Sequence, residues 1–109
     1  MTTFVYIADG AVLSAAATTQ GTVVNGLTRR IIKSASLTNT TASPVACSVY
    51  LIPSGGTAGA ANTFIVLRAV ASGETYNCPE LIGKGLNAGG FIQALGAGVS
   101  FAYSASDVV

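Results

Sequence analysis

Apolar and polar residues alternate with a period of two in the segments that most constrain the fold of this chain. In Val99–Val108 one face carries Val99, Phe101, Tyr103 and Ala105, and the other carries Ser100, Ala102, Ser104 and Ser106. Val45–Ile52 repeats the pattern, with Val45, Cys47, Val49 and Leu51 on one face and Ala46, Ser48, Tyr50 and Ile52 on the other. Successive side chains of a strand point to opposite faces, whereas an amphipathic helix needs a period of 3.6. The alternation therefore predicts strands with one buried face.

Two further segments have the composition of strands, and turn signals separate all of them. Residues 27–39 read as one long strand, with Ile31, Ala35 and Leu37 on one face, Ile32, Ser34 and Ser36 on the other, and Lys33 interrupting the apolar face. Thr63–Val70 is almost wholly apolar and is typical of a central strand. Turn signals such as Asn25-Gly26 and Pro53-Ser-Gly-Gly56 recur along the chain. This organisation predicts an all-β fold: one antiparallel β-sandwich, jelly-roll or Ig-like, formed by residues 1–109 as a single domain.

Charged side chains are scarce: the chain has five Lys/Arg, four Asp/Glu and no His. Most enzyme mechanisms use a titratable group beside the substrate, and nucleic-acid binders carry a basic patch. We therefore expect no enzymatic activity, no cofactor and no nucleic-acid partner. Half of the residues are hydrophobic, and few charges keep the molecules apart, so we expect much of the surface to be covered in an assembly.

No apolar run approaches the roughly 20 residues of a membrane-spanning helix, and the first residues lack the basic and apolar regions of a secretory signal. We therefore expect no contact with a membrane and synthesis in a cytoplasm.

Cys47 and Cys78 lie 31 residues apart without CxxC spacing or a histidine, so no metal site is expected. We interpret them as two buried apolar thiols, with a disulfide between facing strands as the main alternative. A catalytic thiol is not expected, because no histidine is present to activate it.

Other candidate motifs have simpler structural interpretations. Arg29 and Arg30 are adjacent charges that would face opposite ways on a strand; a solvated strand edge is the first interpretation, and a contact with a neighbouring subunit is the second. Glu74 and Glu80 flank a turn and a proline and are interpreted as exposed loop acids, not as a glycosidase pair. The 53–57 segment lacks the Gly-Lys-Ser/Thr ending of a phosphate loop.

Four segments share their order and spacing with a known group of proteins. They are KSASLTNTTASPVACSVYLIPSGG (33–56), NTFIVLRAV (62–70), ASGETY (71–76) and PELIGKGLNAG (79–89) followed by IQA (92–94). Together they cover about two thirds of the chain and resemble small virion proteins of tailed bacteriophages. The resemblance implies a β-sandwich structural protein of the virion, such as a capsid decoration protein, a head-fibre base or a tail part. The chain departs from the pattern at Gly90, where an acid or serine is expected, and at Arg30 and Lys33, which a docking surface specific to this protein would explain.

We expect a capsid decoration (cement) protein on the virion surface, forming a homotrimer bound where capsomers of the major capsid protein meet. Termini and loop tips are free to reach a neighbour. The expected contact residues are Thr2, Phe4, Tyr6, Arg29, Arg30, Asn39, Thr40, Thr41, Ser54, Thr57 and Asn62. Deletion of residues 2–8 is expected to abolish shell binding and to leave the fold largely intact. The alternatives are a tail, head–tail connector or fibre-base protein and, from another class, a carbohydrate-binding adhesion module.

Overall fold

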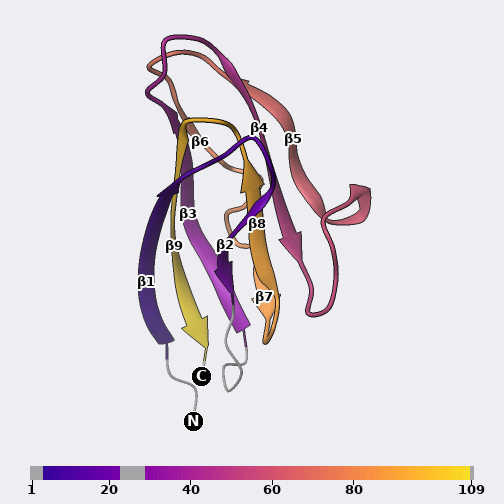
Figure 1. The fold of residues 1–109 in the computed structure, drawn as a ribbon. Coiled ribbons are helices and arrows are strands. Elements are labelled where there is room, and N and C mark those ends of the chain that lie inside the picture. Colours follow the sequence, from indigo (N-terminus) through magenta and orange to yellow (C-terminus); the bar gives the residue numbers. More distant parts are fainter. Residues whose placement is uncertain (1–3, 23–28, 109) are drawn as a thin grey trace.

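The computed structural model describes residues 4–22 and 29–108, and strands dominate them (Figure 1). The elements are β1 (Phe4–Val12), β2 (Thr18–Thr22), β3 (Arg29–Asn39), β4 (Val45–Ile52), the short 3-10 turn η1 (Ala60–Asn62), β5 (Thr63–Val70), β6 (Thr75–Asn77), β7 (Gly85–Asn87), β8 (Phe91–Leu95) and β9 (Val99–Val108). The boundaries of β4, β5 and β9 coincide with the segments predicted from the sequence.

The strands form two antiparallel sheets that pack against each other. One sheet has the order β1-β9-β3-β6, with β7 pairing β3 beyond the end of β6, and the other has the order β2-β8-β4-β5. Strands from the end of the chain thus lie between strands from its beginning, which is the interleaving of a jelly roll. The structure confirms the antiparallel β-sandwich, and its strand order selects the jelly roll over the Ig-like alternative.

The core lies between the sheets and contains the predicted faces of β4 and β9. Val99, Phe101, Tyr103 and Ala105 are all buried, with the Phe101 and Tyr103 rings stacked at 5.8 Å between centroids. The inward face of β4 buries its cysteine, valine and leucine in the same cluster. Alternation therefore identified the core-facing residues of both strands, but Ser48 and Ile52, on the predicted outer face of β4, are buried as well.

A β-bulge in β3 changes which residues face the core. The register with β9 shifts between Ile32 and Ser34, so the exposed Lys33 is an extra residue in the strand. One extra residue reverses the face of everything before it. Ile32, which is fully buried, therefore replaces the predicted Ile31 on the core face, whereas Ala35, beyond the bulge, points inward as predicted.

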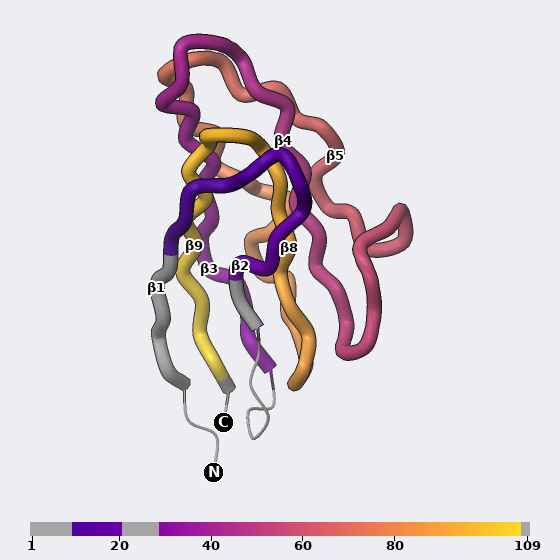
Figure 2. Tube along the Cα trace, in the orientation of Figure 1, coloured from indigo at the N-terminus to yellow at the C-terminus, as the bar shows by residue number. Residues whose placement is uncertain are grey.

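The predicted central position of Thr63–Val70 is wrong, because β5 is the edge strand of its sheet and pairs with β4 alone. Ile65 and Val70 point into the core, but Val66 and Leu67 are 70% and 63% exposed and Phe64 is 37% exposed. An apolar run thus marked a strand with apolar residues on both faces, and only one of those faces is covered within the subunit. The β4–β5 connection, which contains η1, extends away from the body of the sandwich (Figure 2).

Candidate interaction surfaces

The described part of the chain holds neither a metal cluster nor an accessible nucleophilic thiol. No three His, Cys, Asp or Glu side chains gather there in a way that could hold a metal ion. Cys47 and Cys78 are free and fully buried, so the buried-thiol interpretation is correct and the disulfide alternative is not. Burial raises the pKa of Cys78 to about 12 and also raises the pKa of Cys47. Both thiols therefore stay protonated at neutral pH. No helix among the described residues is long and apolar enough to cross a membrane.

The adjacent arginines lie in different environments. Arg29 is exposed, whereas Arg30 is only 9% exposed and faces Asp107 directly across the β3–β9 pairing. Arg30 Nε and Nη2 donate to the two Asp107 carboxylate oxygens at 2.7 and 3.1 Å, and Nη1 donates to the Tyr103 hydroxyl at 3.2 Å. The hydrogen bonds that Arg30 donates to Asp107 raise the pKa of Arg30 above its ordinary value.

Two interpretations from the sequence are corrected by this geometry. The arginines do not lie on a sheet edge, because β3 has β9 on one side and β6 and β7 on the other. Arg30 is not a surface contact, because the bulge turns it inward, where its charge needs a partner. Arg29 remains available at the surface, beside β7.

Asn39 organises the loops at one end of the sandwich instead of contacting a partner. The side chain is fully buried, and its amide nitrogen donates to the carbonyl oxygens of Ser43 and Val70, both at 2.8 Å. Its amide oxygen accepts from the Thr41 backbone N–H at 2.9 Å and the Thr41 hydroxyl at 2.6 Å. Ser72 Oγ then donates to the Thr41 carbonyl at 2.6 Å. The 40–44 and 71–74 loops are therefore held together, with Thr40 exposed on their surface.

The β4–β5 connection carries three further predicted contact residues and is also bonded internally. The Asn62 side chain accepts from the Gly59 N–H at 3.0 Å and donates to the Thr57 carbonyl at 2.8 Å. Ser54 and Thr57 are exposed, whereas Asn62 is half-buried within its own loop. The expected surface loop is thus present, and its conformation is fixed by local hydrogen bonds.

The predicted contact residues do not form one patch. Arg29 and Asn39 are at opposite ends of β3, about 33 Å apart at 3.3 Å per residue (Figure 1). Ser54 lies at the Arg29 end, because it approaches Gly89 in the turn after β7. Thr2 lies outside the described residues, as do the side chains of Phe4 and Tyr6, whose backbone belongs to the edge strand β1. Deletion of residues 2–8 therefore remains a prediction.

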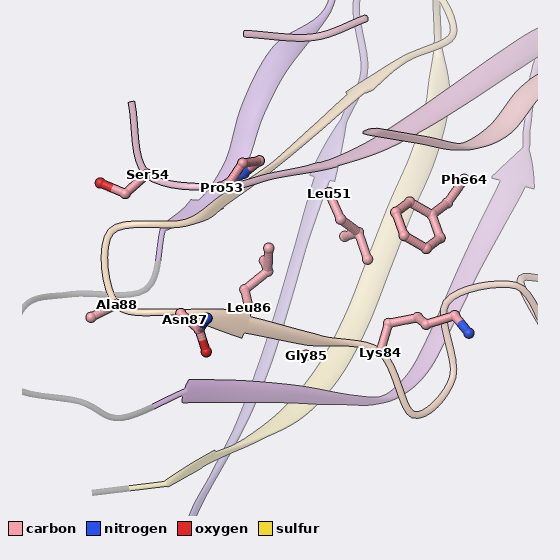
Figure 3. Close-up of a pocket in the computed structure, with 9 residues that line it drawn as sticks. All are labelled: Leu51, Pro53, Ser54, Phe64, Lys84, Gly85, Leu86, Asn87 and Ala88. Carbon is pink, nitrogen blue, oxygen red and sulfur yellow. The ribbon is translucent and has the colours of Figure 1, made fainter. Parts of the chain in front are cut away.

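The structure reveals a third surface that the sequence did not identify as a site. Beside the exposed residues of β5 there is an open cavity of about 470 Å³ between the edges of the two sheets. It is lined by Leu51, Pro53, Ser54, Phe64, Lys84, Gly85, Leu86, Asn87 and Ala88. Figure 3 shows Leu51 and Phe64 pointing toward β7, with Lys84 along the rim. The feature of the sequence that could have indicated this surface is the apolar composition of Thr63–Val70. Central strands have the same composition, so it did not identify an exposed strand.

Comparison with known proteins adds information about the fold. No family model matches the chain, and no curated protein matches it. The structure is similar to a solved structure of a Bacillus endospore appendage, described as one of a novel family of disulfide-linked pili. The TM-score is 0.59 at 13% sequence identity, and the match covers 98% of this chain and 86% of the other. At this identity the likeness shows a shared β-sandwich fold.

Proposed function

We propose that this chain is a non-enzymatic structural subunit of a tailed-bacteriophage virion and acts as a capsid decoration protein bound to the major capsid protein. The observation that best supports this proposal is the arrangement around Asn39, where hydrogen bonds hold two loops together before any partner binds. A preorganised surface loses little conformational freedom on binding. The class of virion protein comes from the sequence resemblance.

The chemistry of this end suits close packing against a shell. Thr40, Ala42, Ser43 and Pro44 are exposed and carry no charge, and the neighbouring exposed residues Ala71, Ser72 and Gly73 are also small and neutral. A contact made by such residues removes no ionised group from water, and desolvation of unpaired charges is the main electrostatic penalty at an interface. Many repeated copies of such a contact would stabilise a lattice through buried area.

Several of the segments that carry the resemblance form turns in this fold, and hydrogen bonds or close contacts fix these turns. Glu74 accepts the Ala71 N–H at 2.7 Å and closes the turn before β6. The tight turn at Gly89, where φ is +83°, lies against Ser54 in the Pro-Ser-Gly-Gly turn, so the two motifs meet at one end of the sandwich. Proteins that share these motifs would share this architecture, which supports a common structural role.

A filament or tail subunit is the second candidate, favoured by the fold likeness to an endospore appendage. That protein belongs to a family described as disulfide-linked. In this chain both cysteines are fully buried, so a covalent link between subunits through either thiol would require the fold to open. A carbohydrate-binding module is disfavoured, because Phe101 and Tyr103 stack inside the core.

The number of copies per purified particle tests the proposal, measured by quantitative mass spectrometry against the major capsid protein. A decoration protein is expected at hundreds of copies in a simple ratio to the capsid protein. A dozen copies or fewer would favour the tail or fibre role, and absence from particles would overturn both virion roles.

A matched pair of variants tests which end contacts the shell. Thr40 and Thr57 are exposed threonines on the two connections that flank β4, one before its first residue and one after its last. Thr40→Lys places a charge in the proposed contact and is expected to lower shell occupancy, whereas Thr57→Lys is expected to leave it unchanged. The reverse result would move the contact away from the loops around Asn39.

A further inference from the structure

The open cavity between the edges of the two sheets, which we call the β5–β7 cavity, is mainly apolar. Five of its nine lining residues are apolar, one is a lysine and none is acidic. Leu51 and Leu86 are buried and line its interior, whereas Phe64 is 37% exposed at its rim. Val66 and Leu67, the exposed apolar residues further along β5, are not among the lining residues. The cavity is therefore a surface of its own.

A bulge in β5 directs Phe64 toward the gap between the sheets. The register with β4 shifts between Thr63 and Ile65, so Phe64 is an extra residue in the strand. An extra residue interrupts the alternation of faces along a strand. Figure 3 shows the Phe64 ring beside Leu51 and directed toward β7. The bulge thus builds one wall of the cavity from an aromatic ring.

A contact between the sheets closes one part of the same side and leaves the cavity open beside it. Arg68, on β5, stacks over the ring of Tyr76, on β6, at 4.2 Å. The Tyr76 hydroxyl donates to the Glu80 carboxylate at 2.7 Å. Four residues earlier on β5, at Phe64, the facing strand is β7, and there a cavity of about 470 Å³ remains. Sites for small molecules typically have volumes of about 300–1,000 Å³.

The positive charge of the β5–β7 cavity lies at one end. Lys84 forms no ion pair among the described residues. Figure 3 shows the Lys84 side chain below Phe64, with Asn87 and Ala88 at the other end of the cavity. From Lys84 to Asn87 the extended backbone spans about 10 Å at 3.3 Å per residue. The cavity is therefore elongated, with a cationic end, an apolar middle and a neutral end.

This arrangement distinguishes between classes of ligand. A hard metal ion needs several oxygen ligands, and none of the lining residues is acidic. A phosphate group is usually held by several charged or backbone donors, whereas Lys84 is the single cation among the lining residues. A sugar would place hydroxyls against apolar walls, where they would lose hydrogen bonds to water. A molecule with one anionic end and an apolar tail matches both the charge and the walls.

We propose that the β5–β7 cavity binds a small monocarboxylate with an unbranched apolar tail. The carboxylate lies against the Lys84 ammonium group, and the tail lies along Leu51, Phe64 and Leu86. Covering these walls is favourable in proportion to the apolar area removed from water, and the ion pair at the rim sets the orientation of the ligand. This binding goes beyond the structural role proposed above and does not depend on it.

Titration of the isotope-labelled full chain with decanoate, followed by the amide chemical shifts in NMR spectra, tests the site. The shifts should be confined to Gly85, Leu86 and the residues around the cavity, with a dissociation constant of about 1 mM or tighter. The amides of β2, at the opposite edge of its sheet, should not move. No shifts, or shifts spread over the whole surface, would overturn the proposal.

Reversal of the charge at the rim tests the orientation of the ligand. Lys84→Glu should raise the dissociation constant of decanoate by about 10-fold or more and should bind decylamine more tightly than the unchanged chain does. Lys33→Glu is the matched control, because Lys33 is exposed at the bulge of β3 and does not line the cavity. In about 0.15 M salt, which screens exposed charges beyond about 8 Å, this control should change either constant by less than about twofold. Equal effects of the two variants, or equal binding of decanoate and decylamine by the unchanged chain, would overturn the proposal.

A second pair of variants tests the apolar wall. Phe64→Ala removes the ring at the rim and should raise the dissociation constant of decanoate by about 5-fold or more. Val66→Ala is the matched control, since Val66 is 70% exposed on the same strand but does not line the cavity. The control should bind decanoate as the unchanged chain does. Equal effects of the two substitutions would contradict the placement of the tail.

Sedimentation velocity separates a small ligand from a second copy of the chain as the occupant. Decanoate should leave the sedimentation coefficient unchanged, because a small ligand adds little mass. Self-association that decanoate reverses would assign the cavity to a second copy and overturn the proposal. The copy number per particle tests the virion role by itself, so failure of either proposal leaves the other standing.

Discussion

Loss of the Asp107 carboxylate is expected to destabilise the subunit far more than loss of the neighbouring charge on Arg29. Asp107 is 5% exposed and holds Arg30 through two hydrogen bonds, at 2.7 and 3.1 Å. In Asp107→Asn the guanidinium stays charged and buried, and its strongest partner becomes a neutral amide. The Tyr103 hydroxyl, at 3.2 Å from Nη1, cannot neutralise it.

Removal of one partner from a buried ion pair typically costs about 3–5 kcal/mol, because the remaining charge is left without compensation. We take the lower limit, about 3 kcal/mol, because both residues retain some exposure. For a chain of this size each kcal/mol lowers the melting temperature by about 4 °C or more, so a fall of about 12 °C or more is expected. Replacement of both partners, as in Arg30→Met with Asp107→Leu, should recover most of this loss because no charge remains buried.

Urea unfolding followed by circular dichroism measures these differences, with Arg29→Met as the matched control. Arg29 is the exposed neighbour on the same strand, so its replacement should change the free energy of unfolding by less than about 0.5 kcal/mol. If Asp107→Asn also cost less than about 1 kcal/mol, the pair would behave as a surface ion pair. The assignment of Arg30 as a core residue would then be wrong.

Three further predictions concern stability. Asn39→Ala removes four hydrogen bonds of a buried amide, including the donor to the Val70 carbonyl, and should cost about 3 kcal/mol in urea unfolding, whereas Thr40→Ala, an exposed control, should be near neutral; equal effects would contradict the role of Asn39. Stability should fall as the pH rises from 9 toward 12, because the unfolded thiol of Cys78 ionises near its ordinary pKa of 9.0 while burial raises the folded pKa to about 12. The loss between pH 7 and pH 10 should be about 1 kcal/mol larger in the unchanged chain than in Cys78→Ala, where Cys47 still contributes, and equal losses in the two proteins would refute it. Gly89→Ala should lower the free energy of unfolding by about 2 kcal/mol or more, because its φ is +83° and a Cβ would lie 2.6 Å from a serine hydroxyl. A Cβ at Gly59 would meet nothing within 4 Å, so Gly59→Ala should be tolerated. The melting curves of the two variants test this difference.

Local pattern alone predicted the strands whose geometry is regular. In β9 the inward positions of Phe101 and Tyr103 follow from alternation, because a strand without bulges keeps the same parity from end to end. The burial of both cysteines and the turns that separate the strands were also readable locally. The β-sandwich class followed from these elements together.

Position within a sheet depended on partners that are distant in the sequence. The bulge at Lys33 exists in the pairing of β3 with β9, and it turns Arg30 toward Asp107, 77 residues away. No local sequence pattern indicates this register, so the sequence analysis predicted a surface position for Arg30. Asn39 was likewise misplaced, because the carbonyl that holds it inside belongs to Val70, 31 residues away.

The sequence by itself therefore determined that this chain forms strands, which face of a regular strand is apolar, and that few side chains are suited to catalysis. The tertiary structure alone decided the order of the strands, the edge position of β5 and the burial of the Arg30–Asp107 pair. The physical reason is that alternation is a property of one strand, whereas register, edge position and charge compensation are properties of strand pairs joined by hydrogen bonds across the chain.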